Sequence, residues 1–333
     1  MPEGFTAILI AVLGLAVLFD YINGFHDTAN AIATSVSTRA LKPQWAIAMS
    51  ATANFVGALT GTAVARTIGA GLIDQQVEGQ VVVAAALLGA IAWNLLTWRF
   101  GIPSSSSHAL IGGLLGASAA AAGIGAWNLD GIVGKVVFPL VTSPIAGFLV
   151  GFTVMVVIFN LFRRAHPKTM NDRFRRLQVL SAAFMAFSHG SNDAQKTMGV
   201  MTLALVTAGV ITEFKVPLPV IIAAASAISL GTAAGGWRII RTMGTKVVKL
   251  DPVHGFAAET SAATIIFGAS TLGMPVSTTH VISSAILGAG SSDRFRAVRW
   301  TVARRIGIAW VVTLPASGLV AALAYLVLKP ILG

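Results

Sequence analysis

The sequence has no cysteine among its 333 residues. Disulfide bonds and thiolate metal sites are therefore excluded, although this absence says little about the cellular compartment. Charged residues are also scarce, since they make up 11% of the chain whereas soluble domains carry about a quarter. No long polar stretch interrupts the sequence. A soluble domain of any size is therefore not expected.

Apolar residues fill the chain instead. They make up 55% of it, and windows of about 20 apolar residues, enough to cross roughly 30 Å of hydrocarbon, recur along the whole length. We therefore predict an all-α integral membrane protein with about 10–12 membrane segments. No Lys or Arg precedes the first segment, residues 5–19, and no small-residue cleavage site follows it. This pattern favours a retained membrane helix over a signal peptide.

The positive charges indicate how the chain crosses the membrane. The formal net charge is +11, which in a soluble protein would suggest nucleic acid as a partner. Here Lys and Arg cluster in short loops, most densely in 163–176, so the positive-inside rule explains them and nucleic acid is not expected. Loop 69–80 contains Asp74 and Glu78 but no Lys or Arg, so we expect it to lie outside. We predict a multi-pass protein of the plasma (inner) membrane, with the central basic loop cytoplasmic and both termini outside.

Two motifs occur once in each half of the chain. The sequence GFHDTANA at 24–31 matches GSNDAQKT at 190–197, and GIPSSSSH at 101–108 matches GMPVSTTH at 273–280. The motifs keep their order and nearly the same spacing, which indicates an internal repeat. Each half makes an odd net number of crossings, as inverted-topology repeats require. We predict a first inverted repeat at 1–162, a basic cytoplasmic linker at 163–176 and a second inverted repeat at 177–333.

The first motif places a carboxylate inside a membrane segment. Such a group costs at least about 2.5–3.5 kcal/mol on insertion scales, so it should face protein, ion or water. Segment 4–40 is too long for one crossing, and we expect a broken helix near Gly24 whose freed carbonyls join Asp27 and Asn30. This all-oxygen set suits sodium, with Asp193 as a further ligand, or a proton carried by the carboxylate. A purely structural role between helices is the alternative. The predicted coupling-ion residues are Asp27, Asn30, Asn192, Asp193 and Glu259, with Asn23 in support.

The second motif suits an anion. Pro103 and Pro275 interrupt apolar runs, and proline is favoured where a helix begins. The hydroxyl residues that follow would open helices of re-entrant hairpins, where free N–H groups and the helix dipole attract anions. Ordinary N-capping explains one such hydroxyl but not a run in both halves. The predicted substrate-binding residues are Ser105, Ser106, Ser107, Ser277, Thr278, Thr279 and Gln195.

Three further residues have open roles. His108 and His280 could bond the anion, fix the loops or relay protons. Lys196 could pair with an aspartate or attract the anion, and the sequence alone does not rank these.

At these residues the chain resembles the PiT family of inorganic phosphate transporters, and above all its bacterial low-affinity carriers. The likeness rests on 24–31, 189–193, 255–260 and the two Pro-x-Ser/Thr-x-x-His loops, and it spans nearly the whole chain. It implies a secondary symporter and not an enzyme. Phosphate, alone or as a complex with a divalent metal, would be imported together with protons or sodium by alternating access. It also implies a homodimer in the lipid bilayer, without a cofactor.

Two other functions remain open from the residues alone. A passive anion channel would use the same loops but need no coupling ion. An intramembrane serine hydrolase is suggested by Ser, His and Asp at membrane depth, but catalysis needs one activated Ser with a spatially separate His. Ser107 and Thr279 are each followed directly by His. This duplicated arrangement fits symmetric binding better than a single nucleophile.

Overall fold

The computed structural model describes residues 6–73 and 79–332. Asp74 and Glu78, which helped to assign loop 69–80 to the outside, lie beyond the described residues. The described chain is helical, as predicted, and its helices are joined by short loops. The α-helices are α1 (Ala7–Ser37), α2 (Pro43–Ala58), α3 (Ala63–Ala70), α4 (Gln80–Phe100), α5 (Ser106–Ala122), α6 (Leu129–Ile132), α7 (Phe138–Leu161), α8 (Pro167–Thr207), α9 (Leu218–Ala234), α10 (Trp237–Arg241), α11 (Pro252–Thr271), α12 (Thr278–Asp293) and α13 (Trp300–Leu332).

Only some of these helices are long and apolar enough to cross a membrane alone. Four of them qualify: α1, α4, the continuous run Leu129–Leu161 and α13. Two bent pairs also qualify, α2 with α3 at 73° and α9 with the helix Trp237–Lys246 at 60°. The described residues therefore contain up to six spans of this kind, a count that leaves out the re-entrant hairpins included in the expected 10–12 segments. Helices α5 and α12, with 17 and 16 residues, are shorter than the roughly 20 residues that a crossing needs.

The two helices that carry the aspartates are continuous. Helix α1 runs through Gly24 without interruption for 31 residues, and α8 runs through Gly190 for 41 residues. The predicted break near Gly24 is therefore wrong, and the breaks lie instead between α2 and α3 and between α9 and α10. As a consequence, the groups around Asp27 that can hold a cation are side chains, because the helical backbone carbonyls are already paired.

Close helix packing explains why glycine stands at positions 24 and 190 of the two aspartate motifs. A Cβ atom added to Gly24 would collide with the carbonyl oxygen of Ile228 on α9. A Cβ atom on Gly190 would collide in the same way with the carbonyl oxygen of Asn54 on α2. Small residues let helix backbones approach closely in membrane proteins, where packing replaces the hydrophobic effect as the driving force. The glycines in the aspartate motifs therefore seat α1 and α8 against their neighbours.

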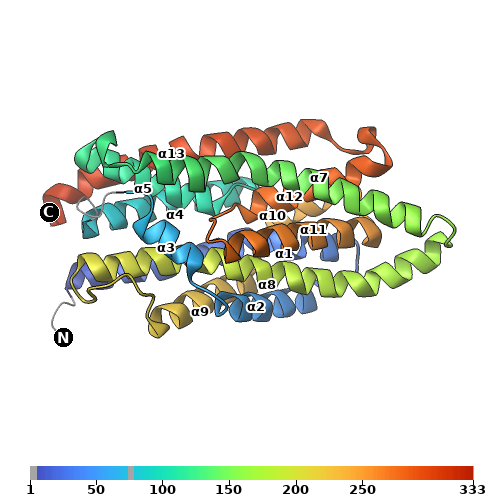
Figure 1. Cartoon of the computed structure of the whole chain (residues 1–333), viewed down its shortest axis with the longest axis horizontal. Helices are drawn as coiled ribbons and strands as arrows, with labels where there is room; N and C mark the ends of the chain where they lie inside the picture. Colours follow the sequence, from blue (N-terminus) through green and yellow to red (C-terminus); the bar gives the residue numbers. More distant parts are fainter. Residues whose placement is uncertain (1–5, 74–78, 333) are drawn as a thin grey trace.

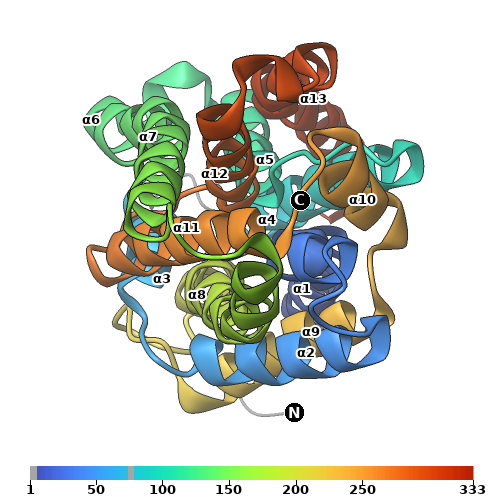
Figure 2. The ribbon, with the colours of Figure 1, turned by 90° about the vertical axis from the view of Figure 1, so that its right-hand side faces the viewer.

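The helices lie roughly along one axis, with both chain ends at the same end of the bundle and the α7–α8 connection at the other (Figure 1). Seen along this axis, α1 and α8 lie side by side, with α2 and α9 below them and α4, α11 and α12 above (Figure 2). Helix α5 lies toward the end that holds the termini, and α12 lies toward the opposite end (Figure 1). The site forms where these elements meet.

Helices of the two halves pack against each other reciprocally. Helix α1 contacts α9 while α8 contacts α2, and α5 contacts α13 while α12 contacts α7. Each of these pairs joins one helix from residues 1–162 to one from the second half, although α8 begins at Pro167, inside the predicted linker 163–176. The hydrogen bond from Asn54 Nδ2 on α2 to Thr232 Oγ1 on α9, 2.8 Å long, links two of the pairs at the centre.

Replacing Gly24 by leucine should destabilise the protein. The added side chain must displace the backbone of α9, and overpacking of this kind costs about 1–3 kcal/mol. Thermal unfolding of the purified protein in detergent, followed by circular dichroism, should show a lower midpoint. Gly14→Leu is the matched control on the same helix, because nothing lies within 4 Å of a Cβ at Gly14. Equal midpoints for the two variants would contradict the packing role of Gly24.

Candidate substrate and ion site

The two hydroxyl loops meet at the centre of the bundle. Ser105 is the N-cap of α5 and accepts a hydrogen bond from the backbone N–H of His108, at 3.2 Å. Ser277 is the N-cap of α12 and accepts from the backbone N–H of His280, also at 3.2 Å. The ring centroids of the two histidines are 4.7 Å apart. The sequence therefore correctly predicts where both helices begin, and the fold brings their N-termini together.

Asp193 on α8 is the most highly connected acid of the site. It is fully buried, and its Oδ2 atom accepts a hydrogen bond of 2.9 Å from the hydroxyl of Thr278. The Nε2 atom of His189, one helical turn earlier, lies 3.0 Å from the same oxygen. The ammonium of Lys196, one turn later, donates to Oδ1. A buried carboxylate is costly unless it is paired and hydrogen-bonded, and here both conditions are met.

Lys196 connects Asp193 to both loops. Besides the carboxylate, its ammonium donates to the hydroxyl of Ser107 on α5 and, at 2.9 Å, to the carbonyl oxygen of Val276 before α12. The side chain is only 2% exposed. An ammonium has three donors, and these three oxygens take up all of them.

The first-half motif makes its own contacts with the loops. Asp27 Oδ1 lies 2.6 Å from Nδ1 of His26, whose Nε2 atom lies 3.0 Å from the hydroxyl of Thr97 on α4. Ser104, in the first loop, donates to that same hydroxyl at 2.8 Å. A short polar chain thus joins Asp27 to the loop before α5.

Asn30 reaches the opposite loop. Its Nδ2 atom donates to the hydroxyls of Thr278 and Thr279, at 3.2 and 3.0 Å, so α1 of the first half holds α12 of the second. The residues predicted to bind a cation and those predicted to bind an anion are therefore direct neighbours.

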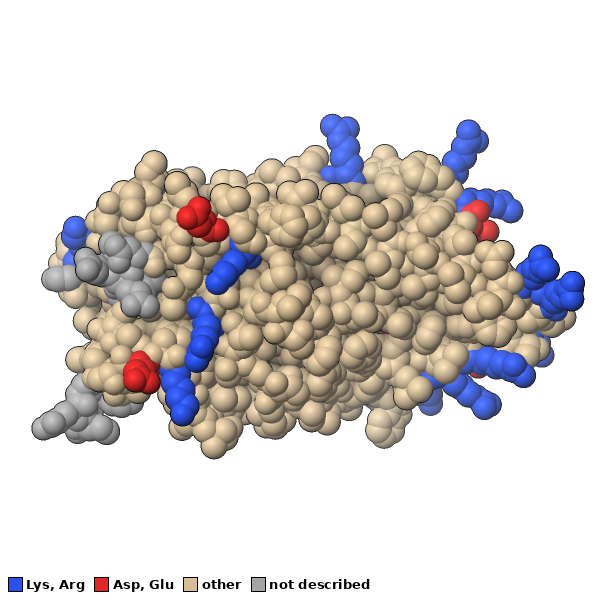
Figure 3. Space-filling model, viewed as in Figure 1, with Lys and Arg blue, Asp and Glu red and all other residues tan. Residues whose placement is uncertain are grey.

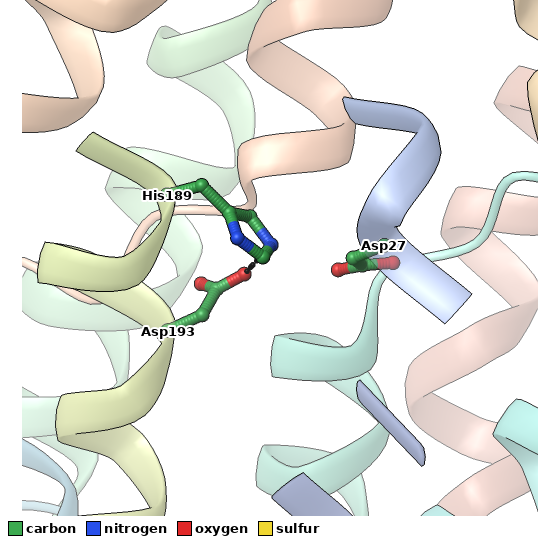
Figure 4. A group of neighbouring side chains, drawn as sticks. All are labelled: Asp27, His189 and Asp193. Carbon is green, nitrogen blue, oxygen red and sulfur yellow. Dashed lines mark ion pairs between the residues drawn. The ribbon is translucent and has the colours of Figure 1, made fainter. Parts of the chain in front are cut away.

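Asp27, His189 and Asp193 form a compact group between α1 and α8 (Figure 4). Each offers one ligand atom, and these atoms lie within 4.8 Å of one another. All three side chains are buried. Lys196 already balances the charge of Asp193, so a proton or a metal cation at this group would serve mainly to balance Asp27.

Several buried polar atoms around the two helix N-termini have no hydrogen-bond partner among the described residues. Leaving a buried polar atom unpaired costs about 1–3 kcal/mol, so a polar ligand that pairs with them would be favoured. His280 also stacks on Trp310, with ring centroids 4.0 Å apart, which fixes its orientation. The unpaired atoms at the loops are the hydroxyl of Ser106, Nδ1 of His108 and both ring nitrogens of His280.

Two of the predicted site residues, Gln195 and Asn192, form hydrogen bonds to neighbouring segments and not to the hydroxyls of the two loops. The side-chain oxygen of Gln195 accepts from the backbone N–H of Val64 at 2.8 Å, close to the start of α3. Its amide nitrogen donates to the carbonyl oxygen of Ser191 at 2.6 Å. Asn192 donates to Ser270 at 2.8 Å and to the carbonyl oxygen of Met274 at 3.3 Å, and so fixes the chain before Pro275.

Glu259 lies in a separate polar cluster between α1, α8 and α11. Its carboxylate accepts hydrogen bonds from the hydroxyls of Thr34 and Ser181 and from Nε2 of Gln178. The side chain is fully buried. Sequence reasoning selected Glu259 as an acid at the start of an apolar segment but did not foresee these partners.

Asp20 and His189 are the residues that the sequence analysis did not select. Both oxygens of Asp20 are buried without a hydrogen-bond partner in the described chain, as is Oδ1 of Asn23. Asp20 precedes Asn23 and Asp27 by three and seven residues, so the three share one helical face. His189 likewise precedes Asp193 by four residues and bonds through Nδ1 to Asn54, at 3.0 Å. The helical spacing of Asp20 from Asp27 and of His189 from Asp193 could have identified both residues from the sequence.

These features define a class of protein. The apolar helices make it a multi-pass membrane protein, and an enclosed polar site with anion-seeking helix N-termini beside buried carboxylates is typical of ion-coupled transporters.

Comparison with known proteins gives the family. Residues 23–321 match the phosphate transporter family, and the chain belongs to it. A protein of Bacillus subtilis named "probable low-affinity inorganic phosphate transporter" is 51% identical over 327 residues, covering 97% of both chains. A Rhizobium meliloti protein of the same name is 48% identical over 320 residues, or 96% of both chains. The resemblance found in the sequence is thus confirmed, and the family is one of transporters and not of enzymes.

A solved structure has the same fold. The sodium-dependent phosphate transporter aligns with a TM-score of 0.90 and 26% sequence identity, covering 98% of this chain and all of the other.

Ser106→Ala should weaken phosphate binding. The hydroxyl of Ser106 is buried and unpaired at the start of α5, and a hydrogen bond to a charged group contributes about 1.5–3 kcal/mol. Equilibrium binding of labelled phosphate to the purified protein should therefore show a dissociation constant roughly 10- to 100-fold higher. Ser118→Ala is the control, because Ser118 lies three turns further along α5 and is bonded to the Leu115 carbonyl. Unchanged binding in Ser106→Ala would remove this residue from the anion site.

Proposed function

We propose that this protein is a secondary active symporter that imports inorganic phosphate together with protons or sodium by alternating access. The observation that carries the proposal is the meeting of two hydroxyl-bearing helix N-termini beside a buried pair of aspartates. Membership of the phosphate transporter family supports the substrate. The solved sodium-dependent relative supports coupling to a cation, without deciding between sodium and a proton here.

Phosphate binds between the starts of α5 and α12 in this proposal. Both helices direct the positive ends of their dipoles and their free N–H groups to the same place. The hydroxyls of Ser105, Ser106 and Ser107 come from one side, and those of Ser277, Thr278 and Thr279 from the other. Neutral donors hold a tetrahedral oxyanion without the strong attraction of a cation, which favours its release.

The coupling cation binds next to the anion, at Asp27 and Asn30 with Asp193 close by. Phosphate beside two buried carboxylates is repelled unless positive charge is also bound. A cation therefore favours anion binding and the anion favours cation binding, and neither alone completes the cycle. The group Asp27, His189 and Asp193 also offers donors suited to a divalent metal carried with phosphate. Asn192 supports this region by fixing the chain before Pro275, and Glu259 offers a second buried carboxylate in its separate cluster for a proton or cation.

Alternating access follows from two inverted repeats, residues 1–162 and 177–333, joined by the linker 163–176. The reciprocal packing of α1 with α9 and of α8 with α2 supports this pseudo-symmetry. The short helices α5 and α12 act as the returning arms of re-entrant hairpins that enter from opposite ends of the bundle. Their common meeting point is the place where a site can open to either side.

The linker faces the cytoplasm and both termini lie outside. In support, Lys and Arg side chains gather most densely at the end of the molecule opposite the termini (Figure 3), as the positive-inside rule requires of the cytoplasmic end. The lipid-facing surface is apolar, with exposed residues such as Leu149 on α7 and Leu319 on α13. A homodimer would cover part of such a surface.

Uptake of labelled phosphate into proteoliposomes tests the function. Wild-type protein should accumulate phosphate under an imposed proton or sodium gradient, because coupled transport moves the anion against its own gradient. Asp27→Asn and Asp193→Asn should reduce this uptake at least about tenfold, the effect of losing roughly 1.4 kcal/mol of interaction with the cation.

Asp130→Asn is the control, because Asp130 on α6 is an exposed acid of the same type. Gel filtration establishes that each variant is folded. Full uptake in both site variants would refute the ion-site assignment. Flux that equilibrates phosphate without responding to any cation gradient would identify a passive anion channel instead.

A further inference from the structure

Lys196 and Asn30 occupy equivalent positions in the two halves. Each stands three residues after the aspartate of its motif. The equivalence extends to their contacts. Asn30 bonds to the hydroxyl of Thr279, and Lys196 bonds to the hydroxyl of Ser107, which is the matching position of the other Pro-Ser/Thr-His loop. One place in the repeat thus holds a neutral amide in the first half and a cation in the second.

The surroundings of the Lys196 ammonium are those of a cation site. It contacts a carboxylate oxygen of Asp193, the hydroxyl oxygen of Ser107 and the carbonyl oxygen of Val276. Oxygen donors of these three kinds are also the ligands of hard metal cations and of the sodium ions in transporters with inverted repeats. The ammonium is enclosed among buried groups of α5, α8 and the loop before α12.

The equivalent place in the first half has no side-chain ammonium. Asp27 lies beside His26 and the amide of Asn30 makes two hydrogen bonds to α12. Thr278 donates to Asp193, but its counterpart Ser106 has a buried hydroxyl without a partner in the described residues. Asp27 therefore has no ammonium beside it, and a cation from solution can take that place.

Lys196 is poorly suited to bind phosphate directly. Its three donors are directed at Asp193, Ser107 and Val276, so a direct bond to the anion would break one of these contacts. Its charge is also offset by the adjacent carboxylate. Of the two roles that the sequence left open, these contacts favour pairing with an aspartate.

We propose that the Lys196 ammonium is a built-in cation that takes the place of one coupling ion, so that only the half-site at Asp27 and Asn30 exchanges a monovalent cation with solution. This inference rests on the proposed symport. It assigns a fixed positive charge to the second half-site in every step of the cycle. Phosphate is then transported with one cation fewer than two equivalent half-sites would require.

Lys196→Asn should allow a second coupling cation to bind beside Asp193. The substitution gives the second half the same Asp-x-x-Asn sequence as the first and removes the tethered charge. In proteoliposomes at fixed pH, the sodium or proton gradient that just stops net phosphate flux reports the number of coupled cations. The variant should couple one more cation per phosphate than the wild type. Lys215→Asn, at an exposed loop position, is the control and should keep the wild-type number.

Further measurements separate this inference from the proposed function. Lys196→Arg keeps a tethered charge and should keep the wild-type number of coupled cations. Equilibrium binding of labelled sodium to the purified wild type requires no transport and should show no more than one sodium ion per chain. An asparagine variant with the wild-type number overturns the inference, and so do two sodium ions on the wild type even if Lys196→Asn does not fold. Absence of phosphate uptake by the wild type would instead refute the symport itself.

Discussion

A carboxylate buried in an apolar helix bundle must be matched by positive charge and hydrogen bonds, and this requirement at Asp193 organises the centre of the protein. Three groups surround this carboxylate: the ammonium of Lys196, the imidazole of His189 and the hydroxyl of Thr278. Two of them lie one turn away on α8, and the third begins α12. The same contacts that stabilise the charge thus fix the loop that starts α12. Removing one partner of such a buried group commonly costs about 3–5 kcal/mol.

The anion site depends on this arrangement. The starts of α5 and α12 would repel each other through their like dipole ends if no negative charge lay between or beside them. The aspartates of α1 and α8 supply negative charge beside these helix starts, where Thr278 donates to Asp193. In the proposed site, a substrate anion supplies negative charge between the starts of α5 and α12. In the proposed symport, binding of phosphate and neutralisation of the aspartates are therefore linked by electrostatics between neighbouring groups.

Much of this centre could be predicted from the sequence, because it is encoded in local patterns. The Pro-Ser/Thr-His loops correctly predict helix starts at Ser105 and Ser277, since proline and N-cap hydroxyls act within a few residues. The break expected at Gly24 is wrong because glycine has two uses in helices. It permits a break and it permits close packing, and only the neighbouring helix α9 decides between them. Glu259 and Gln195 were assigned by residue type, whereas their actual partners lie 78 and 131 residues away in sequence at Ser181 and Val64.

Helices α1 and α2 of the first half pack against α9 and α8 of the second, and this has a consequence for how the protein is made. Helices α1 and α2 leave the ribosome well before α8 and α9 are synthesised, yet these later helices cover the faces of Gly24 and Asn54. Until the second half is made, these two faces of the first half lack the helices that cover them. Assembly of the protein in the membrane therefore depends on the later packing of α9 against α1 and of α8 against α2.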